Sequence, residues 1–267
     1  MVSLKTLIGS FEKLWPKAFS EPWDRPGLML GDPADQVRKV MLAVDPTAAV
    51  LDEAIQANAQ LLITHHPLLL RGVSELGSDT VKGHLVSVAV RGGLAIFAAH
   101  TNADIAEVGT AKALARVVGL DNTIALDPIT GHGLIGELAS PESLLVLSTR
   151  LARALPSVAA GLKVAGDPDQ VIKRVGIAPG AGDGFLGAAL TANVDLFITS
   201  DLRHHPAQDF MEQNQVGAKV ALMDISHWAA ESLWLPLAQK ELQAMHPEIE
   251  FVLSDVRTDP WDFTVMQ

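Results

Sequence analysis

Short apolar runs alternate along this chain with longer stretches in which apolar residues recur every three or four positions. A continuous apolar run predicts a strand buried on both faces, and the wider spacing predicts an amphipathic helix. The predicted strands are residues 40–44, 61–64, 94–99, 134–138, 162–165, 175–178, 196–199 and 220–223. The predicted helices are residues 4–14, 48–57, 81–91, 106–118, 142–155 and 206–214. This alternation is typical of an α/β fold with parallel strands.

The same pattern occurs twice in the sequence. Residues 57–64 align without gaps onto residues 192–199, and Val40 and Val175 each begin a strand directly after a basic pair. Both alignments have the same offset of 135 residues. Two Ala/Val-rich βαβ units can resemble each other by chance, but a shared offset over strand, helix and strand favours a duplication. We therefore expect two structurally related halves, with a boundary at the Gly/Pro-rich residues 127–133.

Composition restricts the chemistry that the chain can perform. Apolar residues make up 48% of the chain and charged residues 19%, which is enough for a sizeable core. The 20 Lys+Arg and 31 Asp+Glu give a net charge of −11, which disfavours general nucleic-acid binding. The absence of cysteine excludes disulfides, thiol catalysis, thiolate zinc sites and iron–sulfur clusters. Any metal must therefore be held by His, Asp and Glu.

The sequence gives no sign of a membrane segment. No stretch reaches the ~18 uninterrupted apolar residues that a membrane span requires. Residues 1–17 do not resemble a signal peptide, because Glu12 interrupts them and no apolar segment with a cleavage site follows. We expect a cytoplasmic protein that does not interact with membranes.

Polar side chains gather where the predicted strands end. His65 and His66 follow the strand at 61–64, and Pro67 prevents that strand from continuing. The polar groups that follow three other strands are His100–Asp104, Ser200–Asp201 and Asp224–His227. Because ligands collect beyond the carboxyl ends of parallel strands, these placements together predict a functional site.

Each of these groups also has a purely structural explanation. Adjacent histidines occur in surface loops, although the emergence of His65 and His66 from a buried strand favours a functional role. Asp104 begins an Asp-x-x-Glu sequence that imitates a capping box, so a helix cap and a metal ligand both fit this segment. His227 and Glu231 are spaced i,i+4 on one helix face, where they either bind one ion or form an ordinary surface pair.

The donor set limits the choice of metal and of reaction. Imidazole and carboxylate groups suit Zn, Fe, Mn or Co. Five ligands are many for one catalytic ion, so we expect two divalent metal ions with a bridging carboxylate. Two ions ~3.5–4 Å apart activate water and stabilise the attacking and leaving oxygens, which favours hydrolysis of a small-molecule substrate. The expected metal ligands are His65, His66, Asp104, His227 and Glu231.

Further polar residues could contact substrate or support the metal ligands, or could simply be the polar starts of helices. These residues are His100, Asp201, His204 and His205. Arg203 is available for a phosphate, and His100 or His205 could move protons. The glycine-rich residues 179–184 form either a tight turn or an anion cradle.

Three other residues are expected to have structural roles only. Trp23 is predicted to anchor packing, and His84 and His246 are predicted to lie at the surface.

Taken together, these motifs resemble the Nif-three-like family of GTP cyclohydrolase I type 2 homologues. The resemblance extends over nearly the whole chain. Its motifs are Trp23-Asp24 with Gly27-Leu28 and Gly31, Ile63–Pro67, His100–Asp104, Gly180–Gly184, Asp195–Thr199 and Ser226-His227 with Glu231. Two departures stand out: Arg25-Pro26 replace a usual Asn after Trp23-Asp24, and Ser200-Asp201 replace a frequent Gly-Glu.

The resemblance implies a dinuclear metal centre on the five expected ligands and a toroidal homohexamer, a trimer of dimers. It also implies two interlinked α/β domains, the first formed by residues 1–126 and 222–267 with most metal ligands, the second by 127–221. The implied activity is hydrolysis of a phosphoester or of GTP with ring opening, with substrate and catalytic residues unassigned. The competing interpretation is a metal-dependent binding or regulatory scaffold without turnover.

Overall fold

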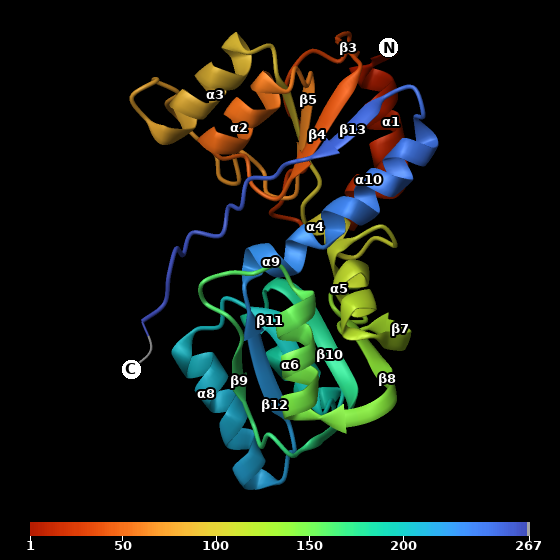
Figure 1. The fold of residues 1–267 in the computed structure, drawn as a ribbon, viewed down its shortest axis with the longest axis vertical. Helices are drawn as coiled ribbons and strands as arrows, with labels where there is room; N and C mark the ends of the chain where they lie inside the picture. Colours follow the sequence, from red (N-terminus) through yellow and green to blue (C-terminus); the bar gives the residue numbers. More distant parts are fainter. Residues whose placement is uncertain (266–267) are drawn as a thin grey trace. The chain divides into compact units, whose positions relative to one another are not determined.

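The computed structural model describes residues 1–265, which form two compact units (Figure 1). The first unit comprises Met1–Gly109 and Trp234–Thr258, and the second comprises Thr110–Leu233 with the segment that begins at Asp259. Both units are α/β folds, as the alternation of strands and helices predicts. Among the described residues, no helix has the length and apolar character needed to cross a membrane.

The first unit is built on a five-stranded sheet in the order β13-β4-β5-β6-β2. Its strands are β2 (Gly27–Leu30), β4 (Lys39–Ala43), β5 (Leu61–Thr64), β6 (Ala95–Ala98) and β13 (Glu250–Leu253). Neighbours are parallel except for β2, which pairs antiparallel with β6 at the edge. The carboxyl ends of β4, β5 and β6 therefore lie side by side. A separate antiparallel pair joins β1 (Val2–Ser3) and β3 (Gln36–Val37).

Helices cover both faces of this sheet (Figure 1). They are α1 (Leu4–Leu14), η1 (Lys17–Phe19), α2 (Ala48–Gln56), α3 (Val81–Arg91), α4 (Thr101–Asp104) and α10 (Trp234–Met245). Helices α2 and α3 pack on one face, where Leu62 and Ile96 belong to their apolar cluster. Helices α1 and α10 lie on the other side, where the Phe11 ring of α1 lies 4.9 Å from that of Phe97. Alternate strand residues thus face opposite helix layers, which explains the continuous apolar runs.

The second unit is built on a six-stranded sheet in the order β7-β8-β10-β11-β12-β9. Its strands are β7 (Leu120–Ala125), β8 (Leu134–Ser143), β9 (Lys163–Ala165), β10 (Val171–Ala181), β11 (Leu196–Ser200) and β12 (Ala221–Ile225). Strands β10, β11 and β12 are parallel, β8 and β9 run antiparallel to them, and β7 at the edge pairs antiparallel with β8. Its helices are α5 (Thr110–Val118), α6 (Leu144–Ala154), η2 (Asp183–Phe185), α7 (Leu186–Thr191), α8 (His204–Glu212), η3 (Gln213–Val216) and α9 (His227–Ser232).

The strand register confirms the predicted relation between the halves. Val40 pairs with Leu61 across β4 and β5, and Val175 pairs with Leu196 across β10 and β11. These pairs differ by the same 135 residues that relate the two sequence segments.

The turns before the second strands are equivalent as well. Asn58 and Asn193 both adopt the left-handed conformation, with φ of 57° and 50°. Two residues after each asparagine, a side-chain oxygen accepts two consecutive backbone N–H groups. Gln60 Oε1 accepts those of residues 38 and 39 at β4, and Asp195 Oδ2 accepts those of residues 173 and 174 in β10. The two halves therefore share a βαβ unit in both register and turn chemistry.

Two predicted helices begin later than expected. The helix predicted at 106–118 is α5, which begins at Thr110, and residues 101–104 form the separate short helix α4. The helix predicted at 142–155 begins at Leu144, because Ser143 caps it by accepting the Val146 N–H. Residues 139–143 instead extend β8.

The boundaries between the two units lie after Gly109 and after Leu233, and not at the predicted residues 126 and 222. Residues 110–126 and 222–233 belong to the second unit, not the first. Strand β12 pairs parallel with β11, and helix α5 contributes Leu114 and Val118 to the second unit's core. These pairings depend on tertiary contacts that local periodicity does not reveal.

Candidate metal centre

Three histidines meet at the carboxyl edge of the first unit's sheet. His65 and His66 follow β5, and His100 follows the neighbouring strand β6. One ring nitrogen from each of the three lies within 4.8 Å of the others, close enough for one metal ion. His65 is 1% exposed, while His66 and His100 are partly buried. The strand-end rule predicted His65 and His66 as ligands, and the structure adds His100 to their group.

Each of these imidazoles has its Nδ1 atom held by an oxygen acceptor. The partner of His65 Nδ1 is the Ala99 carbonyl at 2.9 Å. His66 Nδ1 lies 2.7 Å from Asp45 Oδ1, and His100 Nδ1 lies 3.0 Å from Asp24 Oδ2. Because these oxygens only accept, each Nδ1 carries the proton, which assigns the lone pair of the neutral ring to Nε2. Metal-binding histidines are oriented in this way.

Asp104 lies beside this cluster at the end of α4. Its Oδ1 atom is 3.6 Å from His65 Nε2. The alternative role of Asp104 as a helix cap is wrong, because Asp104 lies inside α4 and α5 begins only at Thr110. A carboxylate that faces the metal-binding nitrogen of a buried imidazole is suited to share a cation with it.

Asp24 supports the cluster from the loop before β2. It is 4% exposed and accepts hydrogen bonds from His100 Nδ1 and from both the backbone N–H and the hydroxyl of Thr101. Burial by itself would raise the pKa of Asp24, but these hydrogen bonds and the charge of His100 outweigh it and lower the pKa to about 2. Asp24 is therefore ionised and fixes the orientation of His100.

Trp23 does not anchor packing as predicted. Its side chain is 60% exposed, and its ring meets the His100 ring edge-on at 5.9 Å. The predicted surface position of His246 is also wrong: His246 is 8% exposed and its Nε2 lies 2.8 Å from Ser10 Oγ. His84 is exposed, as predicted.

The second unit carries the other predicted ligands on α9. Ser226 caps this helix, and its first residue is His227. His227 Nε2 lies 2.9 Å from Glu231 Oε1, and His227 Nδ1 lies 2.7 Å from Asp201 Oδ2. Glu231 is only 2% exposed. The i,i+4 spacing thus produces a partly buried pair whose imidazole also contacts a second carboxylate, unlike an ordinary surface pair.

The electrostatics of this pair favour a cation. Burial would lower the pKa of His227, but the charge of Glu231 and the hydrogen bonds to Asp201 and Glu231 raise the pKa to about 11. The same hydrogen bond from His227 lowers the pKa of Asp201 and outweighs the opposing effect of partial desolvation. In the metal-free protein a proton on His227 therefore offsets part of the negative charge of the two carboxylates, and a metal ion at Nε2 would replace that proton.

Gly180 leaves space beside these two groups. Its φ is +79°, and an added Cβ would lie 2.9 Å from Glu231 Oε1 and 3.6 Å from His227 Nε2. A side chain here would be strained and would crowd both donor atoms. The glycine-rich residues 179–184 therefore form part of the surroundings of the His227–Glu231 pair. The donor types in both units and the space at Gly180 fit a divalent metal.

His204 and His205 are not brought into these groups. They lie in the first turn of α8, exposed, with ring centroids 5.1 Å apart. Arg203, which precedes them, forms an ion pair with Asp183. Within residues 1–265, neither histidine belongs to a cluster of three or more groups that could hold a metal.

Sequence reasoning missed Asp45. Asp45 follows the carboxyl end of β4, so it occupies a strand-end position like the predicted ligands. Its Oδ1 accepts the hydrogen bond from His66 Nδ1. The strand-end rule applied to residues 40–44 would have included it.

Comparisons with known proteins show which family model and which relatives the chain is similar to. The family model described as Duf34/NIF3 (NGG1p interacting factor 3) matches residues 2–260. A Streptomyces coelicolor protein named GTP cyclohydrolase 1 type 2 homolog is 36% identical over 272 residues, which cover 98% of this chain and 94% of the relative. A Clostridium perfringens protein of the same name is 30% identical over 268 residues, covering 98% of this chain and 100% of the relative.

Solved structures share the fold. A Bacillus cereus protein related to NIF3 superposes with a TM-score of 0.91 at 22% identity, covering 99% of this chain and 100% of that one. A Staphylococcus aureus protein superposes with a TM-score of 0.88 at 25% identity, covering 98% and 99% of the two chains.

Proposed function

Since the chain belongs to the Duf34/NIF3 family, we propose that it binds two divalent metal ions and hydrolyses a small-molecule substrate. The ligands in this proposal are those expected from the sequence: His65, His66, Asp104, His227 and Glu231. The metals are Zn, Fe, Mn or Co, which suit nitrogen and oxygen donors. The relatives named GTP cyclohydrolase 1 type 2 homolog make GTP, next to phosphoesters, a substrate to test.

The observation that carries the proposal is the common orientation of the imidazoles. His65, His66, His100 and His227 all have Nδ1 directed at an oxygen acceptor. Ordinary surface histidines have no reason to share this arrangement, whereas metal ligands need it to fix the tautomer.

Bound divalent ions would supply Lewis acidity and lower the pKa of water to near neutrality. The protein's own part is to orient the donors and to move protons. Asp45 and Asp24 hold the rings of His66 and His100 in place. His100 lies beside the predicted ligands, so its Nε2 is suited to carry a proton to or from a substrate.

The first test is the metal content of protein purified without chelators or nickel affinity. We expect about two transition-metal ions per chain by elemental analysis, reduced in both Glu231→Ala and His66→Ala. His84→Ala is the matched control, because His84 is exposed and belongs to no metal-binding group among the described residues. Metal-free protein that stays folded and takes up neither Zn, Mn nor Fe would overturn the proposal.

The second test separates an enzyme from a scaffold. Metal-loaded protein is incubated with phosphoesters and with GTP, and product formation is compared between the parent and Glu231→Ala. Hydrolysis that disappears with the metal supports the enzyme. Metal binding without turnover, together with loss of the assembly when the metal is removed, supports a binding scaffold. Light scattering measures the assembly, for which we expect six chains.

A further inference from the structure

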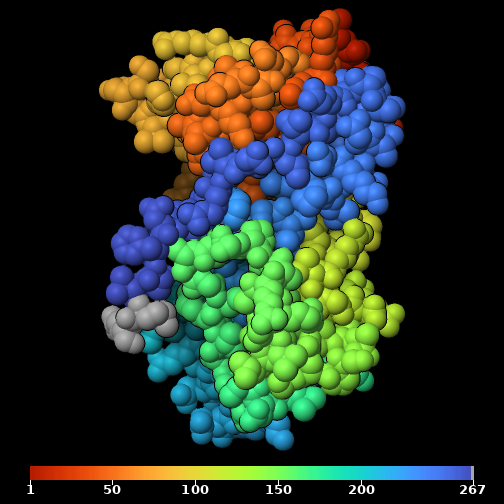
Figure 2. Space-filling view, viewed as in Figure 1, coloured from red at the N-terminus to blue at the C-terminus, as the bar shows by residue number. Residues whose placement is uncertain are grey.

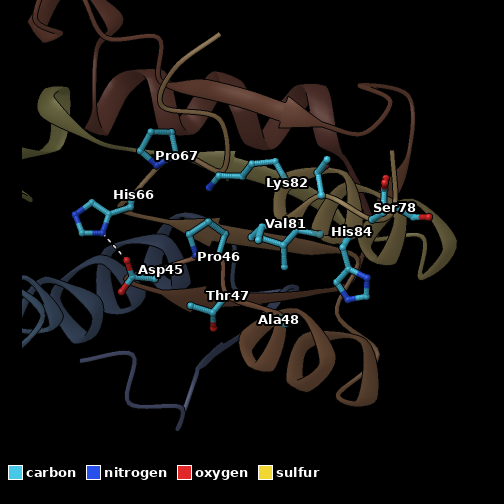
Figure 3. Close-up of a pocket in the computed structure, with 13 residues that line it drawn as sticks. Asp45, Pro46, Thr47, Ala48, His66, Pro67, Ser78, Val81, Lys82 and His84 are labelled. Atoms are coloured by element: carbon cyan, nitrogen blue, oxygen red, sulfur yellow. Dashed lines mark hydrogen bonds and ion pairs between the residues drawn. The ribbon is translucent and has the colours of Figure 1, made fainter. Parts of the chain in front are cut away.

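A cavity of about 600 Å³ lies within the first unit, beside His66 (Figure 3). The segment that leads into α2, with Asp45 and Pro46, lines one side of it, and the start of α3, with Val81 and Lys82, lines another. His66 lies at one end. Both helices lie at the surface of the unit, in orange and yellow in Figure 2. The volume falls in the range of small-molecule pockets, roughly 300–1,000 Å³.

Lys82 provides a positive charge within this cavity. Its side chain extends from α3 so that the ammonium group points toward the end formed by Pro67 and His66 (Figure 3). The residue is exposed, and within residues 1–265 it forms no hydrogen bond or ion pair. A lysine ammonium that is directed into a cavity without an acidic partner is a binding group for an anion.

Neither acidic residue of the cavity is paired with Lys82 within residues 1–265. Asp45 contacts the Nδ1 of His66 and accepts the hydroxyl of Thr258. The Asp79 carboxylate folds back against its own turn, where an added Cβ on Gly77 would lie 2.5 Å from Asp79 Oδ1. Neither carboxylate neutralises Lys82, so the end of the cavity next to His66 favours an anionic group.

The remainder of the cavity is largely apolar. Val81, at the start of α3, is an apolar side chain that is 75% exposed. It lines the cavity together with Pro46, Pro67 and Leu85. In Figure 3 Val81 and Pro46 lie next to each other between the His66 end and the opposite end, where His84 is located. An apolar ligand body would cover this surface.

We propose that this cavity binds the substrate, that the substrate is a phosphorylated small molecule, and that Lys82 binds its phosphate next to His66. This inference rests on the proposed function, because it assigns the substrate class of the same metal-dependent reaction. The apolar part of the substrate lies against Val81 and Pro46.

The test is phosphate binding to the metal-free protein, with inorganic phosphate as the probe. Titrations at 0.15 M NaCl are followed by ³¹P NMR. We expect Lys82→Ala to weaken binding at least tenfold and Lys82→Arg to retain it. Lys13→Ala is the matched control, because Lys13 is an exposed lysine on α1 outside the cavity. Absence of binding by the parent protein, or equal affinity of the parent and Lys82→Ala, would overturn the proposal.

Manganese-loaded protein tests the placement next to His66. A phosphate held between Lys82 and a metal on His66 would show strong paramagnetic broadening of its ³¹P signal, and the broadening would be lost in Lys82→Ala. Broadening that persists unchanged in Lys82→Ala would contradict the placement.

The two proposals fail in different ways. Lys82-dependent phosphate binding without any turnover of phosphoesters or GTP would leave the cavity proposal standing and refute the hydrolase. Turnover with the same KM in the parent and Lys82→Ala would support the hydrolase and refute the cavity proposal.

Discussion

At the scale of single residues, we expect metal affinity to depend on the acidic partners of the imidazoles as well as on the imidazoles themselves. Asp45 holds His66 through Nδ1 at 2.7 Å and does not itself belong to the predicted ligands. We expect Asp45→Ala to lower the affinity for Mn or Zn by roughly 10–100-fold, because His66 would lose its fixed tautomer and orientation. Isothermal titration of metal-free protein measures this. Asp52→Ala, an exposed acid on α2, is the control, and equal affinities of the two variants would show that Asp45 is not needed.

Asp24 gives a prediction about pH. Its pKa is lowered to about 2 in the folded protein from a usual 3.8, so ionised Asp24 stabilises the fold above pH 3.8. This contribution, about 2 kcal/mol, is lost as the pH falls from 3.8 toward 2. We expect Asp24→Asn to be less stable than the parent at pH 7 and the difference to shrink in that acid range.

Urea unfolding of metal-free protein at a series of pH values measures the difference. Asp52→Asn is the matched control, because Asp52 is an exposed acid on α2. A stability difference for Asp24→Asn that stays constant down to pH 2 would contradict the role of the hydrogen bonds to Asp24.

The residues of the site show how far sequence reasoning extends. His65 and His66 are predictable because a buried strand ends directly before them, and the edge of a parallel sheet is where side chains converge. The link from Asp24 to His100 spans 76 residues and exists only once β2 pairs with β6. The sequence predicts Trp23 as a packing anchor, and its 60% exposure is set by tertiary structure that local pattern does not reveal.

At the scale of elements, helix α3 depends on Gly83. An added Cβ would lie 2.0 Å from the Gly77 carbonyl oxygen and 2.5 Å from the Leu76 carbonyl carbon. Replacing glycine by alanine inside a helix gains about 1 kcal/mol from propensity, but a clash with backbone costs about 1–3 kcal/mol. The clash here is with main chain, which cannot rotate away. We therefore expect Gly83→Ala to lower the free energy of unfolding.

The control is Gly9→Ala in helix α1. No atom outside the local helix lies within 4 Å of the Cβ position at Gly9. Only the propensity term remains there, so Gly9→Ala should stabilise the protein by about 0.5–1 kcal/mol. Chemical denaturation compares the two variants, and a stabilising effect of both would show that the loop before α3 yields easily.

The repeated βαβ unit permits a comparison between its halves. Asp195 Oδ2 accepts two N–H groups at 2.9 and 2.7 Å, and Gln60 Oε1 does the same at 2.9 and 3.1 Å. Hydrogen bonds to a charged acceptor contribute more than those to a neutral amide. We expect Asp195→Ala to cost about 1–2 kcal/mol and Gln60→Ala about half as much. Thermal unfolding of the single variants tests this order, and Asp195→Asn should restore part of the loss.

The elements themselves follow closely from local pattern. Strand β5 and helix α3 have the predicted bounds, because an apolar run and two strong end signals define each. The separate helix α4 at 101–104 and the later start of α5 at Thr110 could not be predicted in this way. The short helix α4 is positioned by Asn102, whose Nδ2 donates to the Trp15 carbonyl 87 residues away, and by Thr101.

At the scale of the whole molecule, the chain leaves the first unit after Gly109 and returns to it at Trp234. Apolar periodicity identifies β12 as a strand but does not say which strand it joins. Its parallel pairing with β11 places it in the second unit, and the sequence-based boundary at 222 lies on the wrong side of it for that reason. Strand pairing, rather than the composition of the connections, defines the units.

The first unit is formed by two chain segments that are far apart in the sequence, whereas nearly all of the second unit is one continuous segment. All six strands of the second unit's sheet lie within residues 110–233. The first unit also requires α10 and β13, which follow the second unit in the sequence. Trp234 of α10 is fully buried, and its ring lies 5.2 Å from the ring of Trp15. Loss of a buried tryptophan costs about 3–5 kcal/mol, a large part of the stability of a small domain.

We therefore expect a fragment of residues 110–233 to fold alone, with dispersed amide resonances and a cooperative thermal transition. Residues 1–109 alone should not fold, and joining them to residues 234–258 through a short flexible linker should restore a cooperative transition. The fragment 110–233 should be less stable than the same unit in the full chain, because Asp259 no longer accepts the Ser226 hydroxyl at the start of α9. A folded 1–109 fragment would mean that β4, β5, β6 and β2 suffice for the first sheet, and that α10 and β13 only cover it.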